Sequence, residues 1–331
     1  MAKYMKIRDT ALNVCRIGLG TANAGLAWDG AASFRMLDAY VDRGGNLIDT
    51  ARIYSDWVKP EVGRSERVVG DWIRHRKRHD DVIVMTKGGH PRLDAMHVSR
   101  LSRSEMEADL TMSLRALSMD CVDVYCYHRD DGTLPAEKLI ESMESFVRAG
   151  KIRYYACSNW NTGRMKLADA YSKKMGYRGF VLNQALYNYG SERMKPFPDK
   201  TMVTADAEML AYHAGNASQV LAPYMSLCSG FFHALDGKGE EAGKDSPYFT
   251  SENLAIYQRI KQIAAAHNTG ITQVLLGFIL TREPHMLPLI GVSSLQQLDE
   301  VMAAFDGDFK SEEFDFAVAL SQEAPGGGRQ Q

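Results

Sequence analysis

The sequence predicts an α/β fold, a (β/α)8 barrel in which eight parallel strands alternate with helices around one core. Two observations predict it: eight short apolar runs recur along the chain, and each is followed by a segment of helical periodicity. Near-continuous apolar strands indicate a parallel sheet covered by helices, and eight right-handed units of this kind close into a barrel. An open doubly wound sheet is the competitor, but GLGT after the first run is not the GxGxxG turn of a dinucleotide fold.

The predicted strands are short, and the segments between them are long enough for helices. The strands cover 16–20, 46–50, 82–87, 122–128, 152–158, 180–186, 220–226 and 287–292. Ahead of the first strand, the alternating segment KIRDTALNV suggests a hairpin that closes the barrel floor. Helices are expected where apolar residues recur every three or four positions, as in SFRMLDAYVDRGG, SRSEMEADLTMSLRALSM, PAEKLIESMESFVRAG and SLQQLDEVMAAF. Two longer connections, at 88–102 and 233–250, are expected to be loops beside a functional site.

Length and composition fit one globular domain over 1–331, with a disordered tail predicted at 323–331. The chain has 331 residues, of which 45% are hydrophobic and 24% are charged, which is ordinary for a globular protein. The formal net charge of −2 provides no field to attract nucleic acid or an anionic membrane surface. The expected partner is a small molecule, and the oligomeric state is left open.

The N-terminus and the cysteines favour a cytoplasmic protein. MAKYMKIRDT lacks the apolar core of a signal peptide, and the chain has no run of about 18 apolar residues that would span a bilayer. The five cysteines are an odd set without a CxxC pair or a histidine at zinc-ligand spacing. Neither a disulfide framework nor a metal site is therefore predicted.

Four polar residues stand at or just after the ends of three consecutive predicted strands: Asp49, Tyr54, Lys87 and His128. In a (β/α)8 barrel these strand ends face one mouth, so the four side chains are expected to converge. A tyrosine has an ordinary pKa of about 10, and a neighbouring Lys87 would make Tyr54 more acidic by stabilising its phenolate. Asp49 would hold Lys87, and His128 would donate a hydrogen bond to the carbonyl oxygen that Tyr54 protonates. The set predicts acid catalysis of a reduction whose hydride comes from elsewhere.

Several ordered motifs resemble the aldo-keto reductase family. They are NLIDTARIYSDW with GRSE after it, VMTKGG, YCYHRDD, GKIRYYACSNW, NQALYN and IGVSSLQQLDE, and the resemblance spans residues 6–305. It implies the barrel, a nicotinamide cofactor bound extended across the mouth, and Tyr54 as the proton donor. It also implies an NAD(P)-dependent oxidoreductase that acts on a small carbonyl compound or alcohol.

The same resemblance implies where the cofactor lies. Ser158, Asn159 and Gln184 would hold the nicotinamide carboxamide, and Tyr224 would stack on the ring. Leu227 and Ser229 correspond to the pyrophosphate segment, although Met225 replaces the serine that usually follows the stacking tyrosine. The remaining residues expected at the cofactor are Gly20, Thr21 and Asp49 at the mouth and Gly291, Ser293, Gln297 and Glu300 at the adenosine end.

The adenosine end departs from relatives that prefer NADPH. Many of them carry a lysine or arginine for the 2′-phosphate, whereas Gly291 and Gln297 stand at the corresponding positions here, and Val301 replaces an asparagine beside Glu300. A phosphate would lose a charge-assisted partner worth about 1.5–3 kcal/mol. The family resemblance favours NADP(H) as the cofactor, with NAD(H) as the alternative.

Residues of the predicted mouth suggest where a substrate binds. Trp28, Trp57, His90 and Trp160 lie in or near loops on that face and are candidates for a substrate pocket. Arg129, directly after His128, and two following aspartates make the mouth polar, which suggests a carbohydrate-like substrate. The alternative function is a cofactor-binding subunit that senses redox state with little turnover, which the complete set of four catalytic residues disfavours. A metal-dependent hydrolase is disfavoured because the strand ends supply no HxH or carboxylate–histidine cluster.

Overall fold

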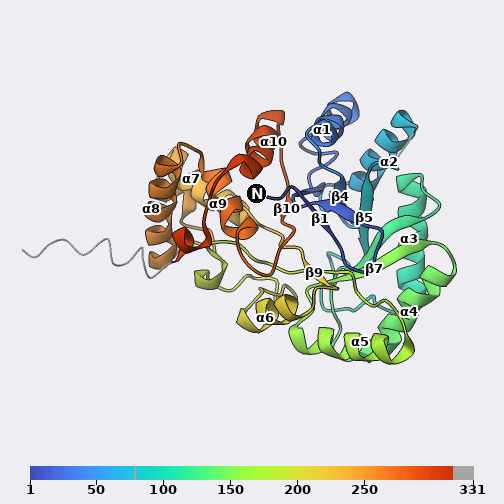
Figure 1. Ribbon diagram of the computed structural model, residues 1–331. Helices are drawn as coiled ribbons and strands as arrows, with labels where there is room; N and C mark the ends of the chain where they lie inside the picture. The colour runs from blue at the N-terminus through green and yellow to red at the C-terminus, as the bar shows by residue number, and fades with distance from the viewer. Residues whose placement is uncertain (78–79, 316–331) are drawn as a thin grey trace, which may run out of the picture.

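The computed structural model describes residues 1–77 and 80–315, which form the predicted barrel (Figure 1). The neighbouring strands of the main sheet are parallel, in the order β10-β3-β4-β5-β6-β7-β8-β9. Backbone hydrogen bonds from Leu287 N to Leu221 O (3.0 Å) and from Leu289 N to Pro223 O (2.8 Å) join the two ends of this order and close the barrel. All eight predicted strands are present: β3 (Gly18–Gly20), β4 (Leu47–Asp49), β5 (Ile83–Gly88), β6 (Val122–Tyr127), β7 (Ile152–Ser158), β8 (Leu182–Gln184), β9 (Val220–Leu221) and β10 (Leu289–Ile290).

Helices cover the outside of the barrel. One helix follows each strand from β3 to β8: α1 (Gly30–Asp42), α2 (Arg64–Arg76), α3 (Arg103–Leu117), α4 (Ala136–Arg148), α5 (Thr162–Met175) and α6 (Ala207–Gly215). Between β9 and β10 the chain forms α7 (Phe231–Lys238), α8 (Ser251–Ala266) and α9 (Ile271–Leu280), which lie together on one side of the barrel, and α10 (Leu295–Met302) follows β10 (Figure 1). The connection 233–250, expected to be a loop, therefore starts inside α7, whose Phe231, Phe232 and Leu235 are buried.

Several helices begin where a short polar side chain accepts a hydrogen bond from the first turn. Such a cap satisfies a backbone N–H group that has no partner within the helix. Helix α5 ends at Gly176, whose φ of 71° is the left-handed conformation that glycine adopts without strain. The capping residues are Asp29, Ser102, Asn161, Asp206, Thr250 and Ser294.

A two-stranded hairpin closes the floor of the barrel, as predicted. Strand β1 (Tyr4–Lys6) pairs antiparallel with β2 (Asn13–Cys15). Ile7, Leu12 and Val14 of this segment form one buried cluster with the apolar interior of the barrel. The strand residues of that cluster include Leu47, Met85, Val124, Cys126, Ala156, Leu182, Val220 and Leu289, and Ala222 directly after β9 also belongs to it.

This inner cluster explains where the polar strand ends point. Side chains alternate between the two faces of a strand, so the residue two positions after an inward apolar side chain also faces inward while the strand geometry continues. Leu47 precedes Asp49 by two positions, and Met85 precedes Lys87 in the same way. A polar layer therefore lies on top of the apolar interior. The same step leads from Cys126 to His128, from Ala156 to Ser158, from Leu182 to Gln184 and from Ala222 to Tyr224.

In the part of the chain that the structure describes, no single helix is long and apolar enough to cross a membrane, and only α8 and α9 taken together, bent by 99°, match a span in length and composition. The same residues hold no group of three or more His, Cys, Asp and Glu side chains arranged for a metal ion. The predicted disordered tail, 323–331, lies outside the described residues.

Candidate active site and cofactor groove

The four catalytic candidates meet at the mouth of the barrel. Lys87 Nζ lies 2.7 Å from Asp49 Oδ1 and donates hydrogen bonds to Tyr54 OH and to the backbone oxygen of Thr50, both at 2.9 Å. Tyr54 OH is 3.5 Å from Asp49 Oδ2. Lys87 and Asp49 are only 1% and 2% exposed, and two charges so deeply buried are tolerated because they pair. The structure thus brings together the residues that strand position singled out.

The ion pair sets the protonation of Lys87, while burial dominates that of Tyr54. Burial alone would lower the pKa of Lys87, but Asp49 and Tyr54 raise it above its ordinary value, so the lysine stays an ammonium. Burial raises the pKa of Tyr54, although Lys87 lowers it. Lys87 acts on the phenol in the expected direction, but burial outweighs it and the pKa of Tyr54 is raised overall. Tyr54 keeps its proton throughout the neutral range.

His128 lies beside Tyr54 and is backed by a second imidazole. Its ring centroid is 5.8 Å from that of Tyr54 and 4.7 Å from that of His90, in edge-on contacts. Burial, reinforced by His90 and Arg129, holds the pKa of His128 well below its usual value. Burial and Arg129 lower the pKa of His90 to about 4. Both imidazoles are therefore neutral at pH 7, so His128 can donate a hydrogen bond but is a poor proton source.

A layer of hydroxyl groups and one carboxyl group lies beneath these residues. Ser65 Oγ is 2.8 Å from Thr21 Oγ1 and 2.8 Å from Thr50 Oγ1. Glu66 accepts a hydrogen bond from Thr86 at 2.5 Å, and its complete burial raises its pKa to about 7. Ser65 and Glu66 hold the chain around the ends of β4 and β5, from which Asp49 and Lys87 project. Sequence reasoning noted GRSE only as a likeness and gave these two residues no role.

A cavity of about 290 Å³ opens beside the catalytic candidates. Gly20, Asp49, Tyr54, His128, Ser158, Asn159, Gln184 and Tyr224 line it, as their strand-end positions suggested. Its other walls include Ala22, Met202 and Leu289, which sequence reasoning missed because a single apolar residue in a loop or strand gives no sign of facing a cavity. We call this space the catalytic cavity.

The amide side chains of the catalytic cavity are held by the protein itself. Gln184 Nε2 donates to Asp49 Oδ1 at 2.9 Å. Asn159 Nδ2 donates to His128 O (3.1 Å) and to Ser158 Oγ (3.0 Å), while its Oδ1 accepts from Val203 N (3.0 Å) and Tyr224 OH (2.6 Å). Four bonds use the full capacity of one amide. Asn159 therefore fixes the orientation of the Tyr224 ring.

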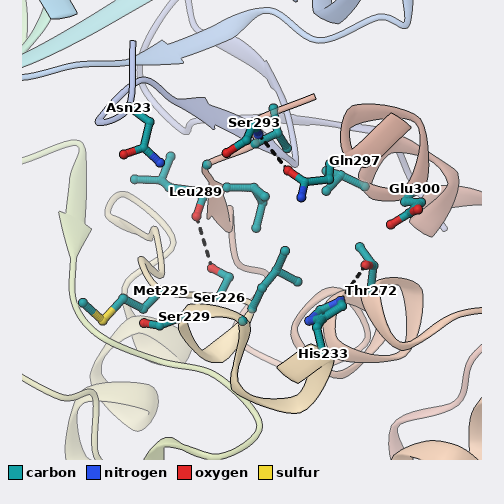
Figure 2. Close-up of a pocket in the computed structure, with 16 residues that line it drawn as sticks. Asn23, Met225, Ser226, Ser229, His233, Thr272, Leu289, Ser293, Gln297 and Glu300 are labelled. Atoms are coloured by element: carbon teal, nitrogen blue, oxygen red, sulfur yellow. Dashed lines mark hydrogen bonds between the residues drawn. The ribbon is translucent and has the colours of Figure 1, made fainter. Parts of the chain in front are cut away.

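A cleft of about 540 Å³ continues from the catalytic cavity to α10 (Figure 2). Met225, Leu289 and Gly291 line both spaces, so the two form one continuous groove. Of the residues predicted at the cofactor, only Thr21 lines neither space: it is buried, and its hydroxyl donates to Asp49 O at 3.0 Å. The predicted residues in the cleft are Leu227, Ser229, Gly291, Ser293, Gln297 and Glu300.

The wall of the cleft before α7 has an unusual backbone. Met225, Cys228, Ser229 and Gly230 have φ values of 53°, 52°, 51° and 78°. Gly230 is the N-cap of α7, and no side chain caps that helix end. Turns containing left-handed residues can form concave surfaces of N–H groups, and a helix N-terminus carries partial positive charge. The N–H groups of Cys228, Gly230 and Phe231 already donate to backbone oxygens, so a pyrophosphate at this wall would be bound through the remaining N–H groups at the start of α7.

The five residues predicted to contact substrate lie in different surroundings. Arg129 lines the catalytic cavity. Trp57 and His90 line a neighbouring cavity of about 770 Å³ that also reaches Lys87. Trp28 and Trp160, in contrast, are buried in the core and line none of these three spaces. Their indole N–H groups donate to Val292 O (2.9 Å) and Arg129 O (3.3 Å), and burial removes the large apolar rings from water.

The charges that suggested a polar mouth pair with one another. Arg129 bonds to Asp199 at 3.0 Å, Arg164 to Asp130 at 2.9 Å, and Arg92 to Asp94 at 3.0 Å. The first pair joins loops that follow β6 and β8, and the second joins the loop after β6 to α5. Charges engaged in this way are less available to a ligand than the sequence suggested.

The barrel, the buried ion pair beside a tyrosine and the adjoining groove together define an oxidoreductase that uses a nicotinamide cofactor. The chain belongs to the aldo/keto reductase family, whose model matches residues 16–321.

Similar proteins carry names of the same reaction class. An aryl-alcohol dehydrogenase from Pestalotiopsis microspora is 25% identical over 319 residues, which cover 92% of this chain and 78% of that protein. Norsolorinic acid reductase B from Dothistroma septosporum is 25% identical over 320 residues, or 91% and 77% of the two chains. An uncharacterized oxidoreductase from Bacillus subtilis is 26% identical over 311 residues, or 92% and 91%. This chain is accordingly an NAD(P)-dependent oxidoreductase.

Proposed function

We propose that this protein reduces an aldehyde or ketone, or oxidises the corresponding alcohol, with Tyr54 as the proton donor to the carbonyl oxygen. The observation that supports this role is the 2.9 Å hydrogen bond from Lys87 Nζ to Tyr54 OH at the catalytic cavity. A bound nicotinamide cofactor would supply the hydride that the carbonyl carbon gains. The protein supplies the proton that the carbonyl oxygen gains, and it positions both partners.

Each catalytic side chain has a distinct part in this proposal. Neutral His128 donates a hydrogen bond to the carbonyl oxygen and polarises it. Tyr54 transfers its proton as negative charge develops on that oxygen, and an alkoxide is a stronger base than a phenolate, so the transfer is favourable although the pKa of Tyr54 is raised. The ammonium of Lys87 stabilises the phenolate that remains, and Asp49 holds Lys87 in place.

For the substrate, we favour a carbonyl compound with an aromatic or apolar body. The carbohydrate-like substrate suggested by the sequence rested on mouth charges that are paired with one another. The neighbouring cavity offers one apolar wall, formed by Ile53, Trp57, Val62, Leu93 and Met112. The charged residues that also line it include the ion pairs Arg92–Asp94 and Arg100–Asp109. The name of the aryl-alcohol dehydrogenase relative supports the same choice.

We propose that the protein is located in the cytoplasm, as its sequence suggests. All five cysteines are free, and four of them are buried. Thiols in this state fit a reducing environment.

The test is turnover of an activated aldehyde, nitrobenzaldehyde, followed by the loss of NADH or NADPH absorbance. Tyr54→Phe should lower kcat by about 10³-fold, because a positioned general acid contributes about 10²–10⁴-fold. Cofactor binding, measured by fluorescence, should stay unchanged. Tyr171→Phe, which removes a phenol oxygen on α5 away from the groove, is the matched control and should keep full activity.

Unchanged turnover in Tyr54→Phe would remove Tyr54 from the role of acid. A wild-type protein that binds cofactor but turns over no carbonyl compound in a panel of aromatic, aliphatic and sugar aldehydes would favour the redox-sensing subunit instead.

A further inference from the structure

The adenosine end of the groove carries no positive side chain. Among the described residues that line the cleft there is neither a lysine nor an arginine. Its histidine, His233, accepts or donates a hydrogen bond with Thr272 at 2.9 Å, and burial lowers its pKa, so it is largely neutral at pH 7. Glu300 is then the one lining residue with a formal charge, and that charge is negative.

At the start of α10, two backbone N–H groups, those of Ser293 and Gln297, already have side-chain partners. Ser294 Oγ accepts from Gln297 N at 3.2 Å. Gln297 Oε1 accepts from Ser293 N at 2.7 Å, as Figure 2 shows. A helix N-terminus binds phosphate through such N–H groups when they are free. A phosphate bound through the N–H groups of Ser293 and Gln297 would have to displace both internal bonds, and it would gain no side-chain cation from the cleft.

The same side chains suit uncharged hydroxyl groups. With Oε1 of Gln297 engaged by Ser293, its Nε2 remains a hydrogen-bond donor at the cleft. Glu300 bonds to Gln296 through Oε1 at 3.2 Å, and a carboxylate has further acceptor capacity. Figure 2 shows Gln297 and Glu300 on the same helix, bordering the same cleft. A donor and an anionic acceptor side by side match a ribose diol, whereas the acceptor repels a ribose phosphate.

We infer that the groove selects NAD(H) over NADP(H), with Glu300 accepting a hydrogen bond from a ribose hydroxyl and Gln297 donating one. The inference rests on the proposed function, since it presumes that a nicotinamide dinucleotide occupies the groove. It reverses the preference for NADP(H) that the family resemblance alone suggests. Selectivity arises from one unbalanced negative charge and from the lack of a cation that would receive the 2′-phosphate.

The test is direct titration of the purified protein with NADH and NADPH at one fixed ionic strength, followed by quenching of tryptophan fluorescence. NADH should bind at least about tenfold more tightly, because a hydrogen bond to a charged group is lost and a repulsion is added for NADPH. Glu300→Gln should bring the affinities for NADH and NADPH closer together. Gln297→Arg should raise NADPH affinity by about tenfold while changing NADH affinity by less than about threefold.

Leu295→Arg is the matched control, because Leu295 is exposed in the first turn of the same helix but does not line the cleft. It adds the same charge and should change the NADH-to-NADPH ratio much less than Gln297→Arg. An equal effect of the two arginine variants would overturn the assignment of Gln297. Equal or tighter binding of NADPH by the wild type would overturn the inference and leave the proposed function standing, whereas binding of neither cofactor would overturn both.

Discussion

The two ends of the groove differ in whether their charged side chains are buried and paired. At the catalytic cavity, the charges of Lys87 and Asp49 are almost completely buried and paired at 2.7 Å. At the adenosine end, Glu300 is partly exposed and no ion pair is found for it among the described residues. A buried pair fixes protonation and geometry because neither partner is tolerated alone. A partly exposed, unbalanced charge has little structural role and instead discriminates between ligands. Reaction chemistry and cofactor choice are therefore separable by mutation.

The largest effects are expected from breaking the buried pair. Lys87→Met leaves Asp49 buried without its partner, which should cost about 3–5 kcal/mol in the free energy of unfolding and at least about 10³-fold in kcat. The double variant Asp49→Asn/Lys87→Met removes both charges and should recover most of the stability but none of the turnover. Urea unfolding and turnover of nitrobenzaldehyde measure the two quantities. A single variant that stays active would show that the ion pair is structural only.

A second effect, in stability alone, is expected at Glu66 beneath the catalytic residues. Its pKa is raised from 4.5 to about 7 in the folded protein, so the folded state holds a proton that the unfolded state releases. The stabilising contribution is complete below pH 4.5 and is lost as the pH rises through 7. Glu66→Gln should therefore raise the free energy of unfolding by up to about 3 kcal/mol at pH 8 and by little at pH 5.

Urea unfolding of the wild type and of Glu66→Gln at both pH values checks this prediction. Glu137→Gln, an exposed change in the first turn of α4, is the control and should show no such pH dependence. A Glu66→Gln protein that is less stable than the wild type at pH 8 would mean that the ionised carboxylate is stabilised by the site.

A smaller effect is expected at the neighbouring cavity. Trp57 is 48% exposed and lines its apolar wall. Trp57→Ala should raise the KM for nitrobenzaldehyde by about tenfold, equal to about 1.4 kcal/mol, through lost apolar contact. The kcat and the affinity for cofactor should hardly change. Val98→Ala is the control, because Val98 is equally exposed but lies in the loop after β5, outside the cavity. An unchanged KM in Trp57→Ala would place the substrate elsewhere.

The sequence was sufficient for the elements that depend on local periodicity. Apolar runs of strand length located all eight strands, and the alternation of side chains carried Asp49 and Lys87 to the inner face two positions beyond Leu47 and Met85. Because parallel strands end at one rim, three strand ends were enough to predict convergence. The hairpin at the floor followed from the same alternation.

Properties that depend on three-dimensional surroundings were not accessible in this way. Trp160 and Trp57 both follow strands, yet one is fully buried against Tyr127 and Phe180 and the other is half exposed. The direction of the pKa shift of Tyr54 depends on how much protein surrounds it, which no spacing reveals. The pairing of Arg129 with Asp199 joins loops that lie 70 positions apart in the chain.

The pH dependence of kcat/KM for aldehyde reduction tests the assignment of the proton donor most directly. Burial raises the pKa of Tyr54, whereas it lowers those of His128 and His90, so the two kinds of acid predict different profiles. With Tyr54 as donor, the rate should stay level from roughly pH 6 to 9 and fall only at higher pH, where the phenol ionises. A rate that already falls steadily as the pH rises from about 5 to 7 would indicate a protonated imidazole and would contradict the account.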